Sequence, residues 1–288
     1  MNLKKVNSTR ADLDTGRHKG NKDSHMQDYI IKLEDIHLKF GERTIFKDLS
    51  IKIPTGKLTA ILGPSGSGKT TLLRLLSGQI IPGSGKVELM QEDIGTISVK
   101  NLYDIRTKMG VLFQSGALFT DMTVYDNVAF SLREHTKLDE SMINTLVLLK
   151  LQSVGLRALK DSYPTQLSGG QARRAALARA IALDPALLLY DEPFAGQDPI
   201  SMGVLIRLIK NLNDALKITS VVISHDVEEV LSIADNVCIL GEGRIITQGT
   251  PDEIRHHQDP WVRQFIDGEV DGPVPFHIPT KSLEEVLF

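Results

Sequence analysis

The sequence contains little cysteine and has no long apolar run. Its single cysteine among 288 residues, Cys238, cannot form an intramolecular disulfide, which favours a reducing compartment. Cys238 lies in the apolar run 237–240, where a small buried side chain is expected rather than a reactive thiol. No stretch approaches the ~20 apolar residues that span a bilayer. The sequence therefore predicts no transmembrane helix.

The chain also lacks a strong charge of either sign. With 33 Lys and Arg against 36 Asp and Glu, its net charge is -3, which gives no global attraction to nucleic acid or to an anionic membrane. Residues 1–27 carry six Lys or Arg, three Asp and no apolar block, so they match no signal peptide. They predict a disordered, solvated tail, with contact of its basic residues to lipid head groups as the alternative.

Strand and helix patterns alternate along most of the chain. The strand candidates are 29–40, 45–53, 58–62, 85–89, 108–113, 186–191, 219–224, 236–240 and 244–248. Apolar residues recur at helical spacing over 204–216. This alternation predicts a mainly parallel sheet covered on both faces, flanked by antiparallel strands at the N-terminal end and near residues 236–248.

Residues 120–170 break the alternation. They show helical patterns at 127–133, 142–151 and 153–159 and no strand of comparable strength. We expect a helical subdomain, about 115–170, inserted in an α/β domain of residues 28–250. Residues 251–288 predict a C-terminal helix and an extended, proline-rich tail.

A glycine-rich loop follows the apolar strand 58–62. It reads Gly63-Pro64-Ser65-Gly66-Ser67-Gly68-Lys69-Thr70-Thr71, the pattern of a phosphate-binding P-loop. Its glycines let backbone N–H groups approach phosphate oxygens, and the following helix directs its positive end at them. Lys69 is expected to bridge the β- and γ-phosphates and the Thr70 hydroxyl to bind Mg²⁺. The loop alone predicts nucleotide binding.

Two carboxylates end the apolar run 187–190. Asp191 should emerge at the carboxyl edge of the sheet beside the P-loop, which suits a direct or indirect contact with Mg²⁺. Glu192 follows and points to the opposite side of the strand.

A second helix start with free N–H groups is predicted at residues 167–171, Leu-Ser-Gly-Gly-Gln. Ser168 is placed as an N-cap, and Gly169, Gly170 and Gln171 lead into an Ala-rich helix at 172–183. Arg173, Arg174 and Arg179 on that helix are expected to form salt bridges.

In this order, with Gln114 after the P-loop and His225 after the carboxylates, the motifs resemble the ATP-binding-cassette (ABC) ATPase family over residues 28–250. The resemblance implies an α/β fold, with a P-loop NTPase (RecA-like) core, an antiparallel β subdomain and an inserted α-helical subdomain. It also implies that Glu192 is the general base for the attacking water. Gln114 would contact Mg²⁺ and that water, and His225 would bond the γ-phosphate of ATP.

The family also implies a homodimer. Ser168 to Gln171 would bind the γ-phosphate of ATP held by a second copy, so that two copies enclose two ATP molecules. Asp198 keeps a cross-subunit position in the loop Ala195-Gly196-Gln197-Asp198. Phe40 stands where the family stacks an aromatic ring on adenine, and a core position is the alternative for it.

The C-terminal sequence narrows the resemblance. The proline-rich stretch 273–279, the apolar residues after 282 and the loop 196–200 are similar to the ATPase subunits of bacterial Mla phospholipid-transport systems. This implies an ATPase at the cytoplasmic face of the inner membrane, bound to integral-membrane permease subunits, with small accessory and periplasmic lipid-binding subunits and no nucleic acid. Its tail would cross to the other ATPase subunit, with docking on its own subunit as the alternative.

Three other functions stay open. They are an ABC ATPase for another cargo, a soluble ABC ATPase of translation or DNA repair, and an ATP-gated clamp without useful turnover. Translation-type members carry two cassettes and repair-type members carry long insertions, and this sequence shows neither. The presence of Glu192 and His225 argues against the clamp.

Overall fold

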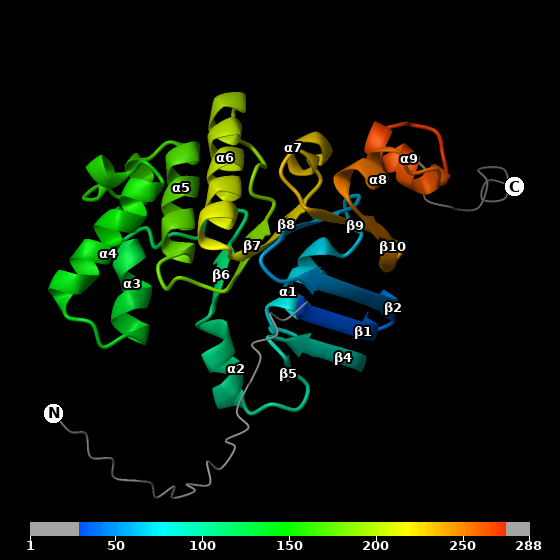
Figure 1. Cartoon of the computed structure of the whole chain (residues 1–288), viewed down its shortest axis with the longest axis horizontal. Coiled ribbons are helices and arrows are strands. Elements are labelled where there is room, and N and C mark those ends of the chain that lie inside the picture. The colour runs from blue at the N-terminus through cyan, green and yellow to red at the C-terminus, as the bar shows by residue number, and fades with distance from the viewer. Residues whose placement is uncertain (1–28, 275–288) are drawn as a thin grey trace, which may run out of the picture.

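The computed structural model describes residues 29–274, which form two β-sheets and their covering helices (Figure 1). The larger sheet has six strands in the order β10-β9-β3-β8-β7-β6, and the smaller has four in the order β2-β1-β4-β5. Neighbours in the larger sheet are parallel except β9 and β10, whereas those of the smaller sheet are antiparallel. The strands are β1 Tyr29–Phe40, β2 Arg43–Pro54, β3 Leu58–Leu62, β4 Ser84–Leu89, β5 Glu92–Asp93, β6 Met109–Leu112, β7 Leu187–Asp191, β8 Thr219–Ser224, β9 Asn236–Gly241 and β10 Arg244–Gly249.

One strand differs from the sequence expectation. β9 and β10 pair in antiparallel fashion at the edge of the larger sheet, as predicted, but β9 itself pairs with β3 in parallel. The reason is the connection before β9, which contains helix α7 (Val227–Leu231) and returns the chain in the same direction. Only the turn at Glu242 and Gly243 reverses it.

The central strands pack against two separate cores. Leu58, Ala60 and Leu62 of β3 face one core and Ile61 faces the other, as the alternation of a strand requires. The second core lies between the two sheets and encloses α1 (Lys69–Leu76), whose Leu72 and Leu75 are fully buried. The loop before α1 is therefore anchored by a buried helix.

Helices α3 (Val124–His135), α4 (Glu140–Ser153) and α5 (Gly169–Ala180) pack on one another, on the side of the molecule away from the smaller sheet (Figure 1). The helix expected over 153–159 is wrong, because Gly155 has a φ of 70° and leads into a 3-10 turn at Arg157–Leu159. Helix α2 (Val99–Arg106) was not predicted. Its apolar residues Val99 and Tyr103 are exposed, so it lacks a periodic buried face.

The chain continues through α6 (Pro199–Leu216), and after β10 through α8 (Pro251–Arg255) and α9 (Pro260–Asp267). Within residues 29–274, no helix is both long and apolar enough to cross a bilayer. The predicted N-terminal tail, residues 1–27, and most of the predicted C-terminal tail lie outside the described residues. At the start of that tail, Val274 N donates to Gln264 Oε1 at 2.7 Å, and Gln264 Nε2 donates to Val274 O at 3.0 Å.

Candidate active site

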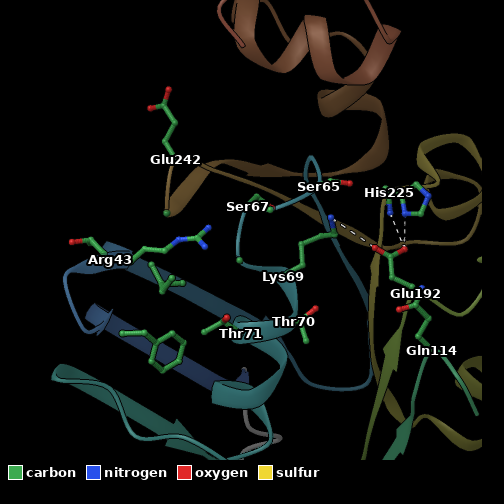
Figure 2. Close-up of a pocket in the computed structure, with 16 residues that line it drawn as sticks. Arg43, Ser65, Ser67, Lys69, Thr70, Thr71, Gln114, Glu192, His225 and Glu242 are labelled. Carbon is green, nitrogen blue, oxygen red and sulfur yellow. Dashed lines mark hydrogen bonds and ion pairs between the residues drawn. The ribbon is translucent and has the colours of Figure 1, made fainter. Parts of the chain in front are cut away.

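A cavity of about 730 Å³ opens beside the P-loop at the carboxyl edge of the larger sheet (Figure 2). Its volume is within the range of small-molecule sites. Residues predicted from four separate motifs meet there. The lining comprises Phe40, Arg43, Thr44, Ile45, Ser65, Gly66, Ser67, Gly68, Lys69, Thr70, Thr71, Gln114, Glu192, His225, Glu242 and Gly243.

Close backbone contacts explain the glycines of the loop. A Cβ on Gly63 would lie 2.3 Å from Leu240 O, so no larger residue fits between β3 and the end of β9. Gly68, with a φ of 101°, is the N-cap of α1 and supplies no side chain to the N–H groups of the first turn. These N–H groups and the positive end of the helix form an anion site beside the cavity.

Lys69 lies inside the loop and is 8% exposed. Its Nζ donates to Gly63 O at 2.7 Å and to Pro64 O at 3.1 Å, and lies 3.7 Å from Glu192 Oε1. Burial lowers the pKa of this ammonium group, and the charge of Glu192 opposes that shift. The ammonium group is thus held at the cavity wall by two neutral backbone carbonyls and one carboxylate.

Glu192 has a positive φ of 44°, an unusual value for a residue with a side chain. Its N–H donates to Ile223 O at 2.8 Å, which turns the residue back toward the end of β8. Glu192 Oε2 accepts from Ser224 Oγ at 3.3 Å. It also accepts from His225 N at 3.2 Å and lies 2.8 Å from His225 Nδ1 (Figure 2). The carboxylate therefore joins the P-loop lysine to the histidine.

Asp191 ends β7 and is half-buried. Burial, together with the neighbouring charge of Glu192, raises the pKa of this carboxyl, while Lys69 and Arg74 oppose the shift. Asp191 is not among the residues that line the cavity, whereas Thr70 and Gln114 are. Hydroxyl, amide and carboxylate oxygens are the donors Mg²⁺ prefers, and a divalent cation would offset the charge of the two adjacent carboxylates. These residues fit the ion.

The predicted second anion site lies at the start of α5 and is not part of this cavity lining. Ser168 Oγ accepts from Gln171 N at 3.2 Å and Gln171 Oε1 accepts from Ser168 N at 2.8 Å, a complete capping box. Gly169 is exposed, and a Cβ on Gly170 would lie 2.6 Å from Ser201 Oγ. The site therefore lies beside the start of α6, facing away from the core.

Asp198 is the N-cap of α6. Its Oδ1 accepts from Ile200 N and Ser201 N, both at 3.0 Å. A hydrogen bond from the Ser201 side chain, together with these backbone bonds, lowers the pKa of the carboxyl. Asp198 is exposed on the same edge as Ser168 and Gly169.

The structure decides two predictions about side chains, the place of Phe40 and the partners of the arginines of α5. Phe40 is 49% exposed at the cavity, so the alternative that it belongs to the core is wrong. The salt bridges expected for Arg173, Arg174 and Arg179 are not found among residues 29–274. All three donate to backbone carbonyls instead.

Sequence reasoning missed the outer wall of the cavity, formed by the start of β2 (Arg43, Thr44 and Ile45) and the turn of Glu242 and Gly243. Lys47 N donates to Gly243 O at 3.1 Å, which joins the turn to β2. Gly243 is typical of a turn between two strands, here β9 and β10. No local pattern shows that this turn contacts β2.

Comparisons with known proteins agree with this geometry. Residues 46–195 match the sequence model of a family described as ABC transporter. The chain is 53% identical over 263 residues to the intermembrane phospholipid transport system ATP-binding protein MlaF of Haemophilus influenzae, which covers 91% of this chain and 100% of that protein.

Two solved structures are also similar. CbiO1 of Clostridium perfringens, part of the ABC transporter complex CbiONQ, is 32% identical with a TM-score of 0.75, over 85% of this chain and 96% of that one. The dimeric ATP-binding cassette MJ0796, bound to ADP and Pi, is 28% identical with a TM-score of 0.70, over 77% of this chain and 98% of that one.

Proposed function

The chain belongs to the ABC transporter family as an ATP-binding protein, and we propose that it powers phospholipid transport between the inner and outer membranes through a separate permease. Its fold is the ABC ATPase fold that the sequence predicted, and it hydrolyses ATP in coupling to transport. The phospholipid cargo rests on one observation, the 53% identity over the full length of a protein named for that role.

We propose the following division of work at the cavity. Lys69 and the N–H groups of the P-loop hold the β- and γ-phosphates, and Phe40 stacks on adenine. Thr70, Gln114 and Asp191 would hold Mg²⁺, which supplies positive charge against the phosphate oxygens. Glu192 accepts the proton of the attacking water on its carboxylate, and His225, 2.8 Å from that carboxylate, hydrogen-bonds the γ-phosphate.

We further propose that two copies pair head to tail. The exposed start of α5 (Ser168 to Gln171) and Asp198 face outward, apart from the cavity of their own chain, so a second copy can receive them at its ATP. A related cassette, MJ0796, is known as a dimer. The tail beyond residue 274 is proposed to reach the same partner.

The permease is proposed to dock beside the loop after Gln114. A cavity of about 370 Å³ lies there between β6, α3 and α5, with Phe113, Phe119 and Phe130 among its lining residues. The rings of Phe119 and Phe130 are 5.0 Å apart, and Phe119 is 40% exposed. A short cytoplasmic helix with apolar side chains fits this groove. With the permease docked there, the ATPase is proposed to be a peripheral subunit at the cytoplasmic face of the inner membrane.

Not every apolar residue near that groove is free to contact a partner. The segment 115–128 contains Leu118, Phe119, Met122 and Val124. Val124 is fully buried and Leu118 packs against the core. Phe119 and the half-buried Met122 remain as candidates for contact.

Affinity purification of the full chain from its own membranes in mild detergent tests the proposal. We expect an integral-membrane permease, small accessory and periplasmic lipid-binding subunits, and bound phospholipid in the purified complex. Ribosomes, DNA or a permease without phospholipid would instead support one of the other functions.

A further inference from the structure

Arg173 makes an unusual set of contacts for a charged side chain. It lies in the second turn of α5, five residues after the N-cap Ser168, and is 8% exposed. Its Nη1 donates to Phe113 O at 3.2 Å and also to Gln114 O, and its Nη2 donates to Ala195 O at 3.2 Å. One buried guanidinium thus contacts three backbone carbonyls on two loops.

Both loops carry residues of the candidate active site. Phe113 and Gln114 follow β6, and the Gln114 side chain lines the cavity. Ala195 comes three residues after Glu192, in the loop that leads to Asp198, and its N–H donates to Glu192 O at 3.3 Å. Arg173 therefore lies between the start of α5 and the two loops that position Gln114 and Glu192.

The loop after β6 depends on α5 for its shape. Gly116 and Ala117 have positive φ values of 74° and 49°, so this loop does not continue the strand. Arg179, further along α5, donates to Gly116 O at 2.8 Å and to Ala117 O at 2.6 Å. The two arginines thus bind the first half of the loop, residues 113–117, and Arg173 alone of the two also reaches the loop after Glu192.

The chemistry of this contact favours arginine. Arg173 is buried, which lowers the pKa of its guanidinium, and backbone carbonyl oxygens take the place of the water that it loses. A planar fork with several donors reaches acceptors on two sides at once, whereas a lysine offers one nitrogen. Removing the fork would leave three carbonyls of the two loops without this donor and free the loops to shift.

We propose that Arg173 is a positioning residue for ATP hydrolysis in its own subunit. It holds the Gln114 loop and the Glu192 loop against α5, so that these two loops keep one geometry. The role of Arg173 rests on the proposed dimer in one respect: Ser168 to Gln171 are taken to bind the ATP of the other copy. A displacement of about 1 Å at a reacting group can cost about 100-fold in rate.

The first measurement compares kcat, KM for ATP and thermal stability of the full-length protein with those of Arg173→Gln, Arg173→Lys and Arg207→Gln. Arg207 is an exposed residue of α6 and controls for the lost charge. We expect kcat to fall roughly 10- to 100-fold in Arg173→Gln and also to fall in Arg173→Lys, with KM within about twofold of the parent. A parental kcat in either variant overturns the proposal, as does a loss that disappears when activity is corrected for folded protein.

The second measurement uses mixed dimers of two differently tagged copies, one carrying Glu192→Gln so that one site alone turns over. Arg173→Gln is placed either in the copy with intact Glu192 or in the other copy. We expect at least a tenfold loss of kcat in the first arrangement and less than a twofold loss in the second. Equal losses, or a loss in the second arrangement alone, would contradict positioning within the same subunit.

The mixed dimer without any change at Arg173 reports separately on the proposed function. If it fails to form, the dimer proposal is wrong, and the uniform variants still decide the role of Arg173.

Discussion

Replacing Glu192 with Gln should stop hydrolysis without stopping ATP binding. The amide oxygen can still accept from Ser224 Oγ and His225 N, which lie 3.3 and 3.2 Å from the carboxylate, so the side chain keeps its place. It cannot take a proton from water. Loss of a general base lowers turnover by roughly 10²- to 10⁴-fold, and each tenfold is 1.36 kcal/mol of barrier, so the barrier rises by about 3–5 kcal/mol.

ATP affinity should be equal or higher in this variant. Lys69 Nζ lies 3.7 Å from Glu192 Oε1, and the substitution removes a carboxylate that competes with phosphate for the lysine. ATP-bound dimers should therefore accumulate. Phosphate release at saturating Mg-ATP and size-exclusion chromatography with ATP measure the two effects, with Glu134→Gln, an exposed carboxylate of α3, as the control. Parental turnover, or loss of ATP binding, would refute the assignment of Glu192 as the base.

Three further predictions concern Lys69, Asp191 and Phe119. Lys69→Ala should abolish ATP binding by calorimetry, because the phosphates lose a buried cation; tight binding would refute the phosphate site. Asp191→Asn should raise the melting temperature at pH 7 and remove ATPase activity. The raised pKa of Asp191 means that folding favours the protonated carboxyl. The contribution of Asp191 to stability is therefore full below the ordinary Asp value of ~3.9 and is lost as pH rises from there through the raised pKa of the folded state. The gain in melting temperature from Asp191→Asn should vanish below that pH. A gain that is the same at every pH would contradict the raised pKa as its cause. Phe119→Asp should detach the permease but keep ATP binding, whereas Tyr103→Asp, at an exposed aromatic of α2, should leave the complex intact; retention of the permease by Phe119→Asp would refute the docking site.

The parts of the fold that have a local pattern were predictable. The apolar run of β3, the glycines after it and the carboxylates at the end of β7 each follow a short pattern that has one structural reason. The sequence therefore placed Lys69 and Glu192 beside each other and Asp191 at the end of β7. The direction of β9 and the turn at Gly155 depend on connections and backbone angles that apolar periodicity does not report.

Contacts between distant segments were not predictable. A charged residue on a helix is normally paired with a carboxylate or with water, so the three arginines of α5 suggested salt bridges. The acceptors turned out to be carbonyls of loops such as 113–117, about sixty residues away in the chain, and no sequence pattern marks a free carbonyl. The outer wall of the ATP cavity was missed for the same reason, because β2 and the turn at Gly243 meet only after both sheets have formed.

The most direct test of the proposed function is ATP-driven phospholipid movement by the purified complex. The complex of this chain with its permease and lipid-binding subunits is reconstituted in vesicles containing a fluorescent phospholipid, and transfer to the periplasmic lipid-binding subunit is followed with and without Mg-ATP. The proposal predicts transfer, in either direction, whose rate depends on ATP and is lost in the Glu192→Gln complex. Equal transfer rates in the parent and Glu192→Gln complexes, or ATP hydrolysis that moves no phospholipid, would contradict it.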